Sequence, residues 1–333
     1  MSEVRYSAAI NRALGDAMHA DASVVLFGED VAKPGGAFGV TRGLLERFGS
    51  VRVRGTPISE LAITGAAVGA AISGLRPVVE IMFMDFVTFA MDAIVNQAAK
   101  AHFMFGGQCS VPMVLRTQHG GGLSAGPQHS QCLEAWFAHV PGLKVVVPAT
   151  PADAYGLLRA AIEDPNPVIF IEHKALYATK GELATVPEAI AIGAARVARD
   201  GQDATVVAYG SSMNLALRAA DELASEGIEA EVIDLRSVQP WDRATVLSSV
   251  RRTGRLVVAH EAVRDFGVGA EISAVVSEHA FAHLRAPVMR VGAEFMPIPF
   301  APALERACLP DADRIAAAVR EAIRYTRRGL PGE

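Results

Sequence analysis

The sequence has few cysteines, no basic excess and no long uninterrupted apolar run, and each absence excludes a class of protein. Its three cysteines, Cys109, Cys132 and Cys308, lie far apart, without metal-ligand spacing or the even number that a disulfide framework needs. The formal net charge of −5 argues against a nucleic-acid partner, which requires a basic surface. Glycine, proline or charged residues interrupt the longer apolar stretches, so we expect no membrane span.

The first residues, MSEVRYSAAINRAL, contain an early glutamate and lack the apolar core of a signal peptide. Together with the expected reduced thiols, this predicts a cytoplasmic protein, or a matrix protein already stripped of its transit peptide. The 333 residues are enough for two domains, and a composition of 51% hydrophobic and 20% charged residues indicates a well-packed globular chain.

Apolar runs of strand length alternate with helical periods along the chain. Strands are expected at 24–30, 77–83, 111–117, 143–147 and 168–173, with helices at 4–20, 60–74, 87–104 and 151–163. The segment 175–194 breaks this pattern and is interpreted as a linker, after which a second, smaller unit repeats the alternation. The sequence therefore predicts an α/β protein of two parallel-sheet domains, 1–180 and 195–333.

Glu60 is the most informative candidate residue. It follows Thr56-Pro57-Ile58-Ser59 and precedes a stretch of small and aliphatic residues, where burying a carboxylate without a partner is costly. Burial usually raises the pKa of a glutamate, which suits a carboxyl group that shares a proton with a heterocyclic nitrogen. The alternative is a glutamate in the first helical turn, favoured there by the helix dipole.

Several blocks around Glu60 decide between these interpretations, because they occur together in one order. They are FGEDVA (27–32), GGAFGVTRGL (35–44), TPISE (56–60), GAAVGAAISGLRPVVE (65–80), QHSQCLEAWFAHVPGLKVVVPATPADA (128–154), NPVIFIEHKALY (166–177) and VIDLRSVQPWD (232–242). In these blocks the chain resembles the beta subunit of the thiamine-diphosphate-dependent first component of 2-oxo acid dehydrogenase complexes. The resemblance implies a transketolase-like pyrimidine-binding domain followed by a transketolase carboxyl-terminal domain. Gly55 departs from the aspartate usual in the family, which bears on the loop before Glu60.

The resemblance also implies roles for three residues. Glu60 bonds N1′ of the cofactor's aminopyrimidine, and Phe86 lies against that ring, with Phe83 the expected core residue. His129, at the end of a glycine-rich loop, assists acyl transfer, since histidine moves protons near neutral pH. The sequence alone would equally allow His129 to cap the following helix. His119, nearer the start of the loop, is the weaker candidate because the resemblance is carried by QHSQ.

A monovalent-cation site is a further expectation. Helix-end carbonyls followed by Asp-Pro-Asn-Pro supply hard oxygen atoms, although the same letters also describe an ordinary turn. Proteins similar to this one hold potassium here. The implied ligand positions are Met113, Ala161, Ile162, Asp164 and Asn166.

The chain contains no Gly-Asp-Gly stretch of the kind that anchors the magnesium ion and the two phosphates of thiamine diphosphate. This absence implies an alpha subunit that holds the magnesium, with the cofactor shared in an α2β2 heterotetramer. The implied activity is oxidative decarboxylation of pyruvate or a branched-chain 2-oxo acid, with acyl transfer to the lipoyl group of the second component, a lipoyl acyltransferase. Acetoin cleavage by a related subunit, a single-chain transketolase and a noncatalytic scaffold are the alternatives.

Overall fold

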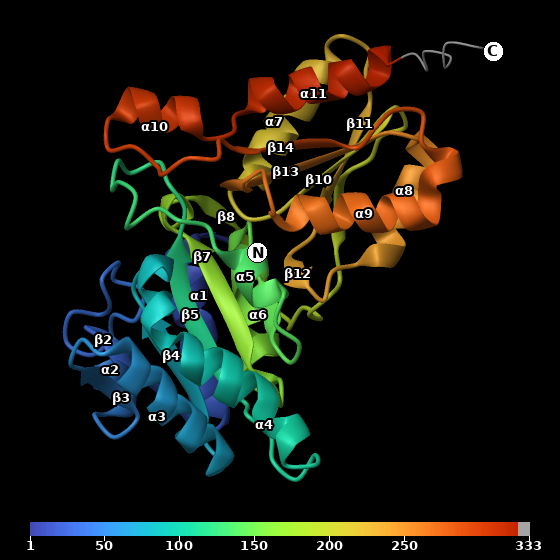
Figure 1. The fold of residues 1–333 in the computed structure, drawn as a ribbon. Coiled ribbons are helices and arrows are strands. Elements are labelled where there is room, and N and C mark those ends of the chain that lie inside the picture. Colours follow the sequence, from blue (N-terminus) through green and yellow to red (C-terminus); the bar gives the residue numbers. More distant parts are fainter. Residues whose placement is uncertain (326–333) are drawn as a thin grey trace.

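The structure, a computed structural model, describes residues 1–325, and its larger sheet has the strand order β12-β6-β7-β5-β4-β2-β3 (Figure 1). Within this described part, β12 is antiparallel to β6 and the other pairings of the sheet are parallel. In chain order the strands are β2 (Val24–Glu29), β3 (Val53–Thr56), β4 (Arg76–Ile81), β5 (Val114–His119), β6 (Lys144–Val146), β7 (Val168–His173) and β12 (Ser237–Gln239).

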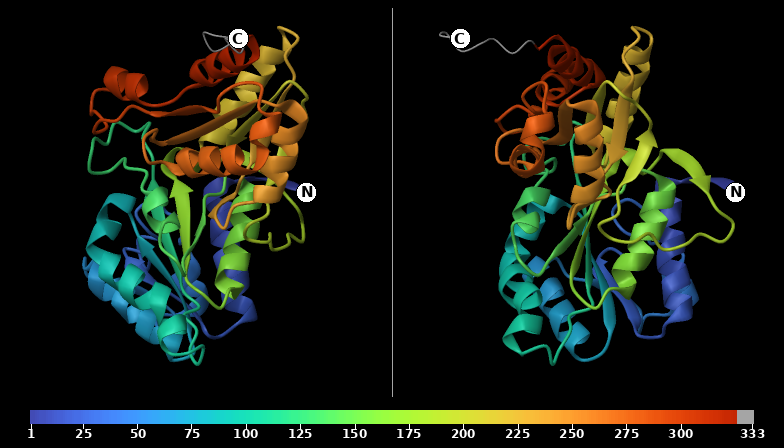
Figure 2. Two further views of the ribbon diagram at one scale, coloured as in Figure 1. Left: turned by 45° about the vertical axis from the view of Figure 1, so that its right-hand side comes forward. Right: turned by 90° about the vertical axis from the view of Figure 1, so that its right-hand side faces the viewer.

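Helices cover both faces of this sheet, as Figures 1 and 2 show. Neighbouring residues of β4 point to opposite faces: Val78 packs with α1 (Tyr6–Ala20) and α6 (Pro151–Glu163), and Val79 packs with α3 (Glu60–Ile72). This explains why the strands read as continuous apolar runs. The remaining helical segments of this unit are α2 (Leu44–Phe48), η1 (Met84–Ala90), η2 (Asp92–Ala98), α4 (Ala99–Met104), α5 (Glu134–Ala138) and η3 (Lys174–Leu176).

The expected strand 77–83 and helix 87–104 differ from the structure. β4 ends at Ile81, and the following segment is a 3₁₀ helix, then a π-helical stretch, then α4. Phe86 therefore lies in η1 rather than at the end of a strand. Periodicity could not distinguish these helix types, because each places apolar residues toward the sheet at similar intervals.

The second sheet has the order β14-β13-β10-β11-β9, with β9 antiparallel to β11; Figure 1 labels the first four of these strands. Its strands are β9 (Arg196–Arg199), β10 (Ala204–Ala208), β11 (Ala230–Asp234), β13 (Leu256–Val263) and β14 (Met289–Ala293). Helices of this unit are α7 (Ser212–Ala224), α8 (Arg243–Thr253), α9 (Val268–Ala280), η4 (Phe281–His283), α10 (Pro302–Cys308) and α11 (Ala312–Arg324). Asp242 and Asp311 accept backbone hydrogen bonds at the starts of α8 and α11, which fixes where these helices begin.

The two sheets are joined more closely than a linker implies. β8 (Lys180–Leu183), inside the expected linker, pairs antiparallel with β1 (Ser2–Arg5) in a separate two-stranded sheet, so this part of the linker belongs to the first unit. β12 comes from the carboxyl-terminal half but completes the edge of the first sheet beside β6. One buried cluster also spans both units, with Val145 of the first and Val207 of the second among its members. Among the described residues, no helix is long and apolar enough to cross a membrane.

Candidate active site

The expected site residues lie beyond the carboxyl ends of the parallel strands, where α/β folds place ligands. Glu60 begins α3, Phe86 lies in η1 after β4, and His129 lies in the loop between β5 and α5. α3 and η1 pack against each other. Residues separated by up to 69 positions (60 to 129) are thereby brought to one edge of the sheet.

Two carboxyl groups meet at the start of α3. Glu60 is only partly buried in this chain, whereas Glu29, at the end of β2, is 3% exposed. Burial raises the pKa of Glu29, and the charges of Glu60 and Asp30 raise it further. Oε1 of Glu29 has no hydrogen-bond partner among the described residues. The strongly buried carboxyl group that we expected at Glu60 is therefore that of Glu29, and Glu60 is the more exposed of the two.

Aromatic rings form the other side of the site. The imidazole of His129 contacts Phe83 and Phe86 edge to face, with ring centroids 4.8 and 5.3 Å away, and the two phenyl rings are 5.6 Å apart. Phe86 also packs against the hydrophobic core. Phe83, expected in the core, is half-buried and instead makes ring contacts, including one with Phe38. This arrangement presents an aromatic ring and an imidazole to the same space.

His129 does not cap the following helix. The N-cap residue of α5 is Leu133, and that helix has no side-chain cap. Lys174 instead donates to the His129 carbonyl oxygen, and its ammonium also lies 5.4 Å from the centroid of Phe83. Burial lowers the pKa of Lys174. The local alternative weighed for His129 is therefore wrong.

The glycine-rich loop 120–131 is anchored at both ends. Near its start, Gly121 N–H donates to Glu261 Oε1 at 2.6 Å, and Gly122 N–H donates to Glu305 Oε1 at 2.9 Å. Near its end, the Gln131 side-chain amide donates to Asp85 Oδ1 at 2.9 Å. The loop is thus held by carboxylates from both domains.

Three charged residues lie inside the first sheet beneath the site. Arg116 on β5 is 0% exposed and bonds Glu80 on β4 at 2.6 Å and Glu172 on β7 at 2.6 and 2.9 Å. Burial acts to lower the pKa of Arg116, but Glu172 and Glu80 carry it above its usual value. Burial raises the pKa of Glu80, and Arg116 offsets this in part. The pairing register places Glu80 opposite Arg116.

Glu261 on β13 links the second domain to the loop. Its Oε2 accepts from Ser211 and lies 2.8 Å from His173 Nε2. Burial acts to raise the pKa of Glu261, but His173 brings it well below the usual range. Glu261 was not among the residues predicted for the site. The available signal was a charged residue in an otherwise apolar strand, which also marks Glu80, Arg116 and Glu172.

The expected potassium ligands lie around a guanidinium group. Arg76 Nη1 donates to the carbonyl oxygens of Ile162 and Asp164 at 2.8 and 3.4 Å. The Asp164 carboxylate pairs with Lys144, and the Met113 carbonyl accepts from the backbone of β7. The carbonyl oxygens of Ile162 and Asp164 thus converge, as a cation site requires. The positive charge between them is the Arg76 guanidinium.

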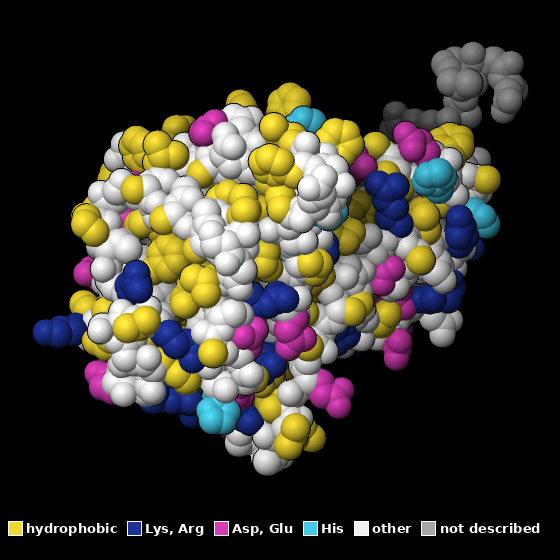
Figure 3. Space-filling view, turned by 90° about the horizontal axis from the view of Figure 1, so that it is seen from below, with side chains coloured by type: hydrophobic (Ala, Val, Ile, Leu, Met, Phe, Trp, Pro, Cys, Tyr) yellow, Lys and Arg dark blue, Asp and Glu magenta, His cyan; other side chains and the backbone are white. Residues whose placement is uncertain are grey.

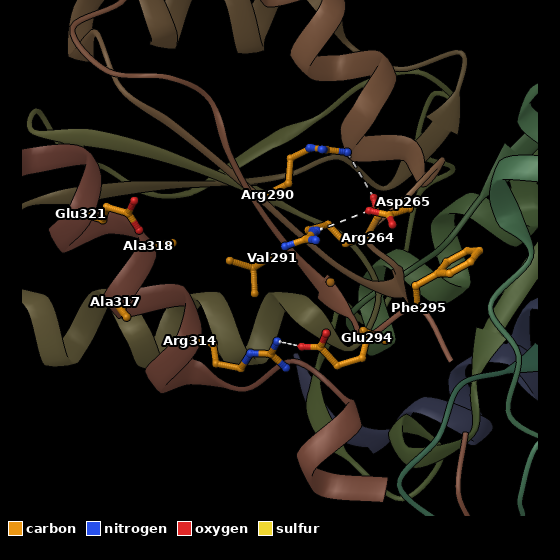
Figure 4. A pocket seen from close by; sticks show the side chains of 12 residues that line it. Arg264, Asp265, Arg290, Val291, Glu294, Phe295, Arg314, Ala317, Ala318 and Glu321 are labelled. Carbon is orange, nitrogen blue, oxygen red and sulfur yellow. Dashed lines mark hydrogen bonds and ion pairs between the residues drawn. The ribbon is translucent and has the colours of Figure 1, made fainter. Parts of the chain in front are cut away.

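Another cavity, of about 260 Å³, lies between β14 and α11, away from these residues (Figure 4). Arg314 pairs there with Glu294, and Arg264 with Asp265. Since its arginines are matched by acids, it has no excess charge with which to bind an anion. At the opposite end of the molecule, Figure 3 shows charged and apolar side chains mixed on the face seen from below.

The sheet topology and the residues at its carboxyl edge define a transketolase-like protein with a pyrimidine-binding domain. The family description "Transketolase, pyrimidine binding domain" matches residues 2–180, and "Transketolase, C-terminal domain" matches residues 193–315. A solved structure, "Split gene transketolase, inactive beta4 tetramer", has a TM-score of 0.81 and 25% identity, covering 97% of this chain and 99% of that one.

Sequence relatives narrow this class. The chain is 48% identical to pyruvate dehydrogenase E1 component subunit beta-2 of Oryza sativa subsp. japonica, covering 99% of this chain and 88% of the relative. It is 47% identical to the beta subunit of acetoin:2,6-dichlorophenolindophenol oxidoreductase of Cupriavidus necator, covering 95% of this chain and 96% of the relative. It is 42% identical to 2-oxoisovalerate dehydrogenase subunit beta of Bacillus subtilis, covering 96% of this chain and 99% of the relative. The chain belongs to the transketolase-like family that contains the beta subunits of pyruvate, branched-chain 2-oxo acid and acetoin dehydrogenases.

Proposed function

We propose that this chain is the beta subunit of a 2-oxo acid dehydrogenase that decarboxylates pyruvate or a branched-chain 2-oxo acid oxidatively and transfers the acyl group to a lipoyl group. The observation that carries the proposal is that Phe86 and His129 are in contact, and Glu60 begins α3, at the same edge of a transketolase-like pyrimidine-binding domain. A scaffold would not require a carboxyl group, an aromatic ring and an imidazole at this edge.

The residues present fit the pyrimidine end of thiamine diphosphate. A flat ring with basic nitrogen atoms needs an aromatic contact and a carboxyl group, which Phe86 and Glu60 offer, while Glu29 beside Glu60 keeps an unpartnered oxygen. When bound, the cofactor supplies an electron sink for decarboxylation. Glu60 holds a proton at the pyrimidine nitrogen, and Phe86 lies against the ring. His129 donates or accepts a proton at the oxygen of the acyl group during its transfer.

The absence of a Gly-Asp-Gly stretch supports a shared cofactor site. We infer that an alpha subunit holds the diphosphate and its magnesium, that activity requires this subunit, and that the assembly is α2β2. The lipoyl group then belongs to a separate acyltransferase component. The scattered cysteines support a reducing compartment, with the cytoplasm as the proposed location. Domain boundaries at 1–180 and 195–333 are part of the same proposal.

Potassium remains part of the proposal as a structural ion. The backbone oxygens of Ile162 and Asp164 converge on Arg76, and Met113, Ala161 and Asn166 complete the implied set. Binding would require the Arg76 guanidinium to release those two carbonyls. A melting temperature that rises in potassium chloride but not in sodium chloride, at equal ionic strength, would support the site.

Acetoin is the second candidate substrate, because identity to the acetoin subunit of Cupriavidus necator, 47%, nearly equals the 48% to the rice pyruvate dehydrogenase subunit. The test is to purify the chain with an alpha subunit and measure turnover of pyruvate, branched-chain 2-oxo acids and acetoin. Glu60→Gln should abolish most turnover, and Glu46→Gln, at an exposed position in α2, is the matched control. An intact assembly inactive on the whole panel would favour the scaffold.

A further inference from the structure

Three potential metal ligands converge beside the His129 loop. His119 ends β5, Cys132 lies in the segment before α5, and Glu134 begins α5. A histidine nitrogen, the cysteine sulfur and a carboxylate oxygen lie within 4.8 Å of one another. His119 Nδ1 is 3.5 Å from Glu134 Oε2. The three residues lie near one another in the sequence, but their spacing does not form a metal-binding motif. The fold brings their ligand atoms together.

The cluster contains buried polar atoms without partners. Neither ring nitrogen of His119 has a hydrogen-bond partner in the described chain, although this residue is only 2% exposed. Oε2 of Glu134, which is 0% exposed, makes no hydrogen bond and faces His119 Nδ1 in the ion pair, while Tyr209 donates to the other oxygen at 2.8 Å. Buried polar atoms in folded proteins are almost always satisfied. The ion pair with Glu134 occupies only Nδ1 of His119, so its buried Nε2 remains an unused ligand atom.

We propose that His119, Cys132 and Glu134 bind one divalent transition-metal ion of the zinc class. Imidazole, thiolate and carboxylate are the ligands that zinc takes in proteins, whereas magnesium and calcium select oxygen atoms alone. Three protein ligands leave a fourth position for water. This ion is separate from the magnesium that the alpha subunit is proposed to hold.

The geometry allows closure around such an ion. Ligand atoms of a tetrahedral zinc site are about 3.4–3.6 Å apart, given metal–ligand bonds of about 2.0–2.3 Å. Atoms within 4.8 Å of one another therefore have to approach by up to about 1.4 Å, which rotation of the side chains can supply. Cys132 lines cavities of about 950 and 510 Å³, which give the ion and its water a route.

Charge balance also fits. The Cys132 thiol donates to Glu261 Oε1 over a long distance of 4.0 Å, a weak contact that a sulfur–metal bond would replace. When the sulfur–metal bond forms, the S–H bond breaks and the proton passes to water in the cavity. The thiolate and the Glu134 carboxylate then match the two positive charges.

The bound ion would close the loop that carries His129. His119 precedes residues 120–131 and Cys132 follows them, so one metal would clip together both ends of this segment. Glu134 extends the clip to α5 and, through Tyr209, to the second domain. This role is structural and does not depend on the proposed chemistry of His129.

Titration of the metal-free, full-length chain with Co²⁺ tests the site. We expect one equivalent to bind, with the near-ultraviolet sulfur-to-cobalt charge-transfer absorption of a thiolate complex and a higher melting temperature. Cys132→Ser should remove that absorption, and His119→Gln should weaken binding at least tenfold. Cys109→Ser, whose thiol lies outside the cluster, is the matched control and should behave as the parent chain.

Absence of the charge-transfer absorption in the parent chain would overturn the proposal, as would its persistence in Cys132→Ser. Circular dichroism establishes whether each variant is folded. Should Cys132→Ser not fold, His119→Gln decides the question, because it keeps every thiol. Unchanged cobalt affinity in that variant would also refute the site.

Discussion

Replacing His129 separates its chemistry from its packing. The imidazole touches Phe83 and Phe86 edge to face, and each such contact is worth about 0.5–1.5 kcal/mol. His129→Ala loses both contacts, and because the ring is only half-buried we expect a cost of about 1–2 kcal/mol. That corresponds to a fall in melting temperature of about 2–8 °C. His129→Phe keeps an aromatic ring in place and should melt close to the parent chain.

Acyl transfer and decarboxylation should not both follow the melting temperature in these variants. Loss of a general acid–base group typically lowers a rate by about 10²–10⁴-fold, or about 3–5 kcal/mol in the barrier. Acyl transfer to a lipoyl domain should fall by this factor in both His129→Ala and His129→Phe. Decarboxylation with an artificial electron acceptor should survive better, because Glu60 and Phe86 are unchanged.

The measurement is both activities and the melting temperature on one preparation of each variant, assembled with the alpha subunit. Transfer restored to near the parent rate in His129→Phe would refute the proton-transfer role, since that variant retains only the packing. Equal losses of both activities that follow the melting temperature across the two variants would show that His129 acts through structure.

Four further outcomes are expected. Glu60→Gln should retain fold and assembly but lose about 10²–10⁴-fold in turnover; near-normal turnover would remove it from the site. Calorimetry should find weak thiamine diphosphate binding to the chain alone, whereas tight magnesium-dependent binding would reveal an unnoticed phosphate site. Arg116→Met should lower the free energy of unfolding, measured by urea denaturation, by about 3–5 kcal/mol, because Glu80 and Glu172 lose their cation. Adding Glu80→Gln and Glu172→Gln should recover part of that stability, because no unpaired charge then remains buried. Glu29→Gln should raise the free energy of unfolding by about 1 kcal/mol at pH 7. The folded-state pKa of Glu29 is raised, so the parent chain loses stability as the pH rises through that pKa. That gain should vanish below about pH 4, where Glu29 is protonated in both the folded and unfolded states, and a gain independent of pH would contradict the assignment.

The α/β class could be predicted from the sequence for a physical reason. Strands buried on both faces need apolar residues at every position, so Val78 and Val79 are both required although they face different helices. The same reasoning found the start of α3 at Glu60 and the alternation of the second unit. It did not find β8 or β12, because strands of four and three residues carry too little pattern to distinguish them from loop.

The residues of the candidate site divide in the same way. Glu60, Phe86 and His129 were found because the blocks around them resemble a family, whereas their placement at one edge follows from the parallel order of β3, β4 and β5, the strands that precede them in the chain. Which glutamate is buried, Glu29 or Glu60, depends on the packing around the end of β2 and the start of α3 and could not be predicted from adjacent letters.

The sequence by itself determined the alternation of strands and helices and the presence of the chemical groups. Only the tertiary structure decided their partners. The carboxylates of Glu261 and Glu305 reach the His129 loop across more than 130 residues of chain, at the interface between the two domains. Hydrogen bonds and ion pairs act over a few ångströms, so a contact between residues this distant in sequence exists only once both sheets have folded and packed together.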